Sequence, residues 1–146
     1  MAHLHPLPTP VKLSKLGRGL AAAQVIKETL TIVLLGVPLV REEPIILLSA
    51  LPGLVLYLLH WQMWRGRVRR RYAAAVWAFT LLDELWGWFL FRELDAPTRG
   101  QVRLMHWSYF LGLGLILLAL VEVSWRYRRA RAKTLRKPAE PAQRPG

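Results

Sequence analysis

The chain has 146 residues, of which 53% are hydrophobic, seven are Trp and none is Cys. The absence of Cys excludes disulfides, thiolate metal sites and Cys nucleophiles. A net charge of +12 is compatible with nucleic-acid binding. However, the Lys and Arg residues lie almost entirely between long apolar segments and in the tails, which is the pattern of a membrane protein. We therefore do not expect nucleic acid as a partner.

Four continuous apolar segments of about 20 residues have the length that crosses a bilayer core. Because they are continuously apolar rather than alternating, they predict helices instead of strands. The predicted spans are residues 20–40, 44–64, 72–91 and 104–125. The expected fold is all-α, an integral membrane bundle of four transmembrane helices over residues 19–125. Residues 1–18 are predicted to form a cytoplasmic tail, and residues 126–146 a basic, disordered cytoplasmic tail.

The distribution of basic residues predicts the orientation of the spans. If the N-terminus is cytoplasmic, every Lys and Arg outside the spans lies on the inner side, except for Arg41, Arg92, Arg99 and Arg103. The positive-inside rule then places both termini in the cytoplasm, and we expect the inner or plasma membrane. The inner basic segments suit anionic lipid headgroups, at about 1 kcal/mol per charge near the surface. The expected lipid contacts are Arg65, Arg67, Arg69, Arg70, Arg71, Arg128, Arg129 and Arg131.

Polar side chains at membrane depth form a narrow face on each of two spans. The first-span face follows i, i+3, i+4, i+7 spacing, and the third-span face is comparable. Together these faces form a predicted polar cluster of Gln24, Lys27, Glu28, Thr31, Thr80, Asp83 and Glu84. Asp83 is expected about 16 Å from the inner end of its span, near the middle of a core about 30 Å thick, with Lys27 at similar depth.

An isolated charge in lipid costs about 3 kcal/mol or more, so we expect the two polar faces to meet and Lys27 to pair with Asp83 or Glu84. Lys27 and Glu28 are about 100° apart on a helix and are expected to be poorly placed to pair with each other. One Lys against three carboxylates leaves two surplus acids, which require protons, a cation, a partner or water. The cluster is compatible either with helix packing and partner contact or with a proton- or cation-coupled site.

A second candidate site is an inner-face pocket of Tyr57, His60 and Glu122. His60 and Glu122 are expected at similar depth. As a binding site, this pocket would take a lipid headgroup or a quinone at the cytoplasmic surface. The favoured interpretation is instead an interfacial aromatic belt, which would also include Trp77. Metal-ligand spacing such as HExxH is absent, and no metal or cofactor is predicted.

Smaller features concern helix shape and packing. Gly36 and Pro38 interrupt the first span, where a Pro can kink a helix. Ser108 and Gly112 form a small-xxx-small pair, which hints at close helix packing in the fourth span.

The residues identify no catalytic group. The leading hypothesis is an interaction or accessory subunit that contacts lipids and a partner membrane protein or a second copy of itself. The alternative is a small proton- or cation-coupled transporter or channel, formed as an oligomer. A third hypothesis is a membrane enzyme that acts on a lipid or quinone.

Overall fold

The computed structural model describes residues 13–42, 47, 50–93 and 97–135. Apart from short turns these residues are helical, with no strand among them, so the all-α prediction is confirmed. The elements are α1 (Lys15–Thr31), the π-helical turn η1 (Ile32–Gly36), α2 (Val37–Glu42), α4 (Leu51–Trp64), α5 (Arg70–Arg92) and α6 (Arg99–Leu135).

Three helical segments are long and apolar enough to cross a membrane. They are Lys15–Arg41, Tyr72–Arg92 and Arg99–Ala132. These segments indicate a membrane protein. The predicted span at residues 44–64 falls partly outside the described residues, and residues 51–64 of it form the helix α4.

α1, η1 and α2 follow one another without a break and form one long helix with a wider turn in it. Ser14 begins this helix, since its hydroxyl oxygen accepts a hydrogen bond from the Gly17 amide at 2.8 Å. In η1 the Val37 amide donates to the Ile32 carbonyl, five residues back. The physical reason lies one residue further on, because Pro38 has no N–H and its ring crowds the preceding turn.

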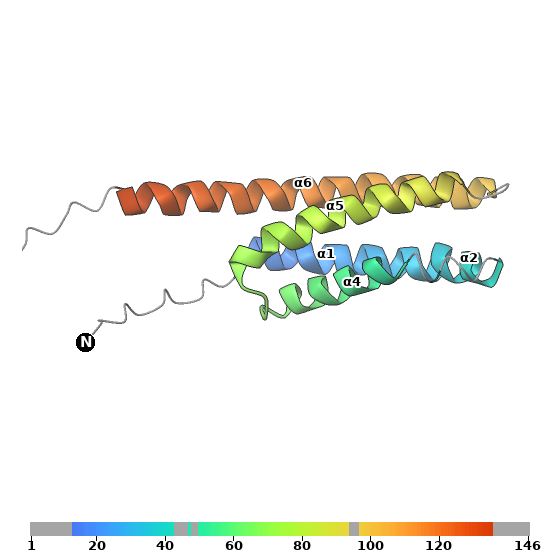
Figure 1. Cartoon of the computed structure of the whole chain (residues 1–146), viewed down its shortest axis with the longest axis horizontal. Helices are drawn as coiled ribbons and strands as arrows, with labels where there is room; N and C mark the ends of the chain where they lie inside the picture. Colours follow the sequence, from blue (N-terminus) through green and yellow to red (C-terminus); the bar gives the residue numbers. More distant parts are fainter. Residues whose placement is uncertain (1–12, 43–46, 48–49, 94–96, 136–146) are drawn as a thin grey trace, which may run out of the picture.

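A tight turn joins α4 to α5. Gly66 adopts a φ of 72°, its amide donates to the Met63 carbonyl at 2.9 Å, and the Arg67 amide donates to the Gln62 carbonyl at 2.9 Å. This is a Schellman motif, which requires a left-handed residue directly after the helix. The chain therefore reverses here, and α4 and α5 run antiparallel (Figure 1).

α6 is longer than the predicted span at both ends, beginning at Arg99 and continuing to Leu135. The prediction of a disordered tail from residue 126 is therefore wrong for residues 126–135. Arg, Ala and Lys are good helix formers, and extending an existing helix needs no new nucleus. This part of α6 projects past the other helices (Figure 1). Residues 136–146 lie outside the described residues.

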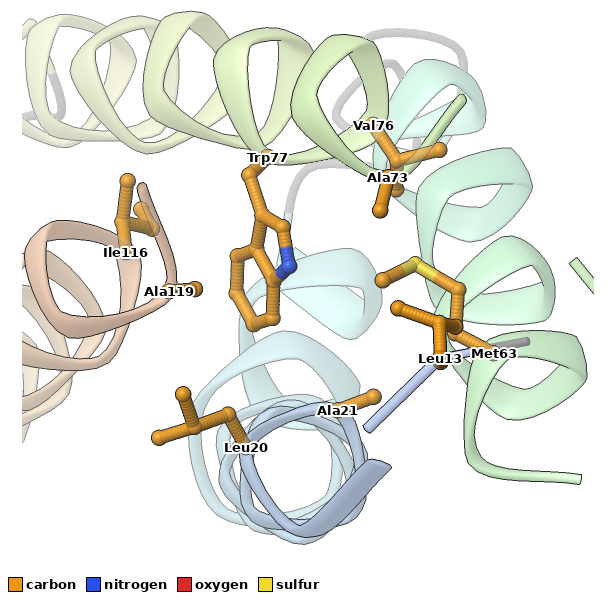
Figure 2. Packing of buried hydrophobic residues seen from close by; sticks show 9 residues of the cluster. All are labelled: Leu13, Leu20, Ala21, Met63, Ala73, Val76, Trp77, Ile116 and Ala119. Carbon is orange, nitrogen blue, oxygen red and sulfur yellow. The ribbon is translucent and has the colours of Figure 1, made fainter. Parts of the chain in front are cut away.

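The helices pack in a ring in which α1 contacts α4 and α6, and α5 contacts the same two helices. Figure 2 shows the main core, with Trp77 of α5 pointing into the space between the helices. Its buried members are Leu13, Leu20, Ala21, Met63, Ala73, Val76, Trp77, Ile116 and Ala119. Trp77 is 0% exposed, so its predicted place in an interfacial belt is wrong. It packs in the core because it lies on the side of α5 that faces the other helices.

Candidate functional site

A buried ion cluster joins α1 to α5. The Lys27 ammonium pairs with the Glu84 carboxylate across the two helices, and it also pairs with Glu28, whose Oε1 lies 2.8 Å from Nζ. Lys27 is only 5% exposed and Glu84 only 8%. The expectation that Lys27 and Glu28 are poorly placed to pair with each other is wrong, because two long side chains can bend across the angle between their backbone positions.

Gln24 supports the same two carboxylates from one turn earlier on α1. Its Nε2 donates to Glu28 Oε1 at 2.9 Å and to Glu84 Oε1 at 3.4 Å, and the residue is 0% exposed. Each carboxylate therefore receives hydrogen bonds from both an ammonium and an amide. Charge-assisted bonds of this kind are stronger than neutral ones, so the cluster holds α1 and α5 in a defined register.

The two threonines of the predicted cluster have different partners. Thr31 and Ser108 share a hydrogen bond of 2.7 Å between their hydroxyl oxygens, which links α1 to α6. Thr80 donates to the Val76 carbonyl of its own helix at 2.8 Å. Thr31 thus extends the polar contacts to a third helix, whereas Thr80 uses its donor within α5.

The adjacent acids of α5 face different helices. Glu84 lies against Gly112 of α6, where a Cβ added to the glycine would be 2.6 Å from Glu84 Oε1. Asp83 lies against Gly53 of α4, where a Cβ would be 3.0 Å from Asp83 Oδ2. Each glycine gives a carboxylate room beside a neighbouring helix. Lys27 therefore has Glu84 rather than Asp83 as its partner on α5.

The three residues of the predicted inner-face pocket have different partners among the described residues. Tyr57 lies near Thr29, with 3.3 Å between their hydroxyl oxygens. His60 is 1% exposed and packs edge-on against Trp77, with ring centroids 4.5 Å apart.

Glu122 instead lies at the beginning of α1. It accepts a hydrogen bond from the Ser14 hydroxyl at 2.6 Å and pairs with Arg126. The similar depth of His60 and Glu122 stays a prediction. The sequence offered one usable signal, the i, i+4 spacing of Glu122 and Arg126.

Two of the predicted lipid-contact arginines lie over tryptophan rings. The Arg65 guanidinium carbon is 5.1 Å from the Trp61 ring centroid, and that of Arg129 is 4.7 Å from Trp125. Both pairs have i, i+4 spacing; the first lies at the end of α4, and the second lies within the last third of α6. Four other predicted lipid-contact arginines are exposed: Arg67, Arg69, Arg128 and Arg131. The side chains of Arg70 and Arg71 lie outside the described structure.

Within the described parts of the chain, no group of three His, Asp or Glu side chains is arranged to hold a metal ion. The ion cluster is thus a site of paired charges contributed by α1 and α5 and seated against a glycine of α6. Comparison with protein-family models, with curated proteins and with solved structures gave no match.

Proposed function

We propose that the chain is a four-span integral protein of the inner or plasma membrane, with both termini cytoplasmic, that acts as an interaction or accessory subunit of a membrane assembly. The observation that carries this proposal is the closed pairing of Lys27 with Glu84 and Glu28. In this pairing the charged groups bind to one another and hold helices together. A transport site must instead expose its charged groups to water, first on one side of the membrane and then on the other. Intramembrane polar groups of this kind serve as links between helices.

The outward-facing side chains support the same proposal. Large apolar residues are exposed along every long helix, among them Ile26, Leu58, Phe79 and Leu117. A membrane subunit needs such surfaces for lipid and for neighbouring spans. The polar cluster then makes the chain a rigid body on which a partner can pack.

The experiment for this function is native purification in mild detergent from cells that express tagged and untagged copies together. We expect a particle heavier than one copy plus its micelle, with a different membrane protein present at fixed stoichiometry. Capture of the untagged copy alone would indicate a homo-oligomer. A single copy with no companion would contradict the subunit role.

The topology can be tested separately, because the natural chain contains no Cys. Single Cys residues introduced at Arg67 and at Thr98 lie in the two connections that flank α5. We expect an impermeant maleimide added outside intact cells to label position 98 and not position 67. Labelling of 67 alone would reverse the proposed orientation, and labelling of both or neither would contradict a single crossing by α5.

A second candidate function is a proton- or cation-coupled transporter. It is favoured by the excess of acid, since Lys27 stands against Glu28, Glu84 and Asp83, and Asp83 is only partly buried. Purified protein in vesicles that contain a pH-sensitive dye distinguishes the two candidates. Flux that is driven by a cation gradient and lost in Asp83→Asn would favour the transporter, and flux equal to that of empty vesicles would favour the subunit.

A further inference from the structure

Asp83 is an acid at membrane depth that the ion cluster does not neutralise. It lies near the middle of the spanning segment Tyr72–Arg92 and is only partly buried. Among the described residues it has no ion pair and no hydrogen bond, and its carboxylate lies against Gly53, which carries no charge. Lys27 is already paired with two other carboxylates. A carboxylate at this depth is costly unless a group of opposite charge pairs with it.

A continuous apolar surface runs along α5 beside Asp83. We call it the outer face of α5, and its members follow i, i+3, i+7, i+10 spacing with exposed fractions of 49–62%: Phe79, Leu82, Trp86 and Phe89. Asp83 follows Phe79 by four residues and precedes Trp86 by three, so it lies at the edge of this face that borders α4. A helix that packs on the outer face can therefore bring one of its side chains to the carboxylate.

The charge at this edge selects what can cover it. Lipid tails carry no charge, so they leave Asp83 unpaired. A second copy of the chain has no suitable cation, because Lys27 is the one Lys or Arg within the four predicted spans. Lys27 is also only 5% exposed and is held by Glu84. The complementary surface is an apolar helix of a different protein, with a basic side chain near its middle.

We propose that the outer face of α5 binds a transmembrane helix of a different membrane protein, and that a Lys or Arg in the middle of that helix pairs with Asp83. The inference rests on the proposed role as a subunit, and it specifies the surface and the chemistry of the partner. Packing on the four apolar side chains supplies the contact area. The ion pair selects the partner and fixes its position along α5, since a helix without the cation leaves Asp83 unpaired.

The first measurement is site-specific photo-crosslinking of the full chain in native membranes. A benzophenone amino acid replaces Phe79 or, as the control, Leu117, an exposed apolar residue of α6. We expect position 79 to form an adduct with a different membrane protein, and the crosslinked peptide to come from a spanning segment that contains Lys or Arg. Position 117 should not form this adduct.

The second measurement is the amount of that protein recovered with the tagged chain. Asp83→Asn should lower the recovery by about tenfold or more, because the cation of the partner is left unpaired. Glu93→Gln makes the same change from carboxylate to amide at an exposed position directly after α5, and it should leave the recovery unchanged. Replacing the Lys or Arg of the partner by Met should partly restore its recovery with Asp83→Asn, because the unpaired charge is gone.

Several outcomes would overturn this proposal while the subunit role stands. They are unchanged recovery with Asp83→Asn, a loss that the Met substitution in the partner does not relieve, a crosslinked segment without Lys or Arg, or an adduct formed at 117 and not at 79. An adduct at 79 with a second copy alone would also overturn it. No companion for the unmodified chain would overturn the subunit role as well. If Asp83→Asn does not fold, the crosslinked segment still decides, because that chain retains Asp83.

Discussion

Lys27→Met is expected to lower the free energy of unfolding by about 3 kcal/mol or more, because it leaves the Glu84 carboxylate buried without its cation. Glu84 is 8% exposed, and its other hydrogen-bond donor is the neutral amide of Gln24. Met is close to Lys in length, so the change removes the charge while much of the packing is retained. Unfolding of the detergent-solubilised protein by heat or denaturant measures the loss.

A second substitution identifies which acid is left unpaired in Lys27→Met. Adding Glu84→Gln should restore part of the lost stability, since the unpaired charge is gone. Adding Asp83→Asn is the matched control, because Asp83 lies against Gly53 of α4 and should change stability independently of Lys27. Equal rescue by both changes, or rescue by neither, would contradict the pairing of Lys27 with Glu84.

Gly112→Ala is the second change from which we expect a large effect. Its Cβ would lie 2.6 Å from Oε1 and 2.8 Å from Cδ of Glu84, so the carboxylate must move or α6 must shift. The carboxylate is held by Lys27 and Gln24 and cannot swing away freely. We expect a loss of roughly 1–3 kcal/mol, as for overpacking in a core. The same unfolding measurement applies.

Gly114→Ala is the control for this prediction, since nothing lies within 4 Å of the Cβ that this substitution adds. There the change should be neutral or should stabilise the helix by up to about 1 kcal/mol, as Ala is the better helix former. In a Glu84→Ala background the penalty at Gly112 should also disappear. A penalty that is the same with and without the Glu84 side chain would mean that Gly112 contacts something else.

How much could be predicted from the sequence depends on the range of the interactions involved. The all-α class and the polar face of α1 follow from local periodicity, which is a property of one helix at a time. The choice between Asp83 and Glu84 does not follow, because adjacent residues differ only in which neighbouring helix they face. That choice depends on Gly112 and Gly53, two positions distant in the chain from α5 and from each other.

Depth along a span was a weaker guide than periodicity. Glu122 contacts Ser14 at the beginning of α1 and His60 lies beside Trp77, and neither partner could be predicted from depth. Counting residues from a boundary places a residue along one helix, but it does not say which neighbouring helix the side chain faces. Trp77 shows the related error, since an aromatic residue near a span end can equally well face the core.

The length of α6 places its positive charges at different distances from the membrane surface. With 37 residues it is about 55 Å long, and a hydrocarbon core is about 30 Å thick. In the proposed topology Arg131 lies about 9 Å further along the axis than Trp125, which is about one Debye length at physiological ionic strength. Arg129, held over the Trp125 ring, would act on headgroups somewhat more strongly than Arg131 at ordinary salt, and both would act more strongly in dilute buffer. The charged end of α6 would therefore couple to the membrane surface more strongly as the ionic strength of the cytoplasm falls.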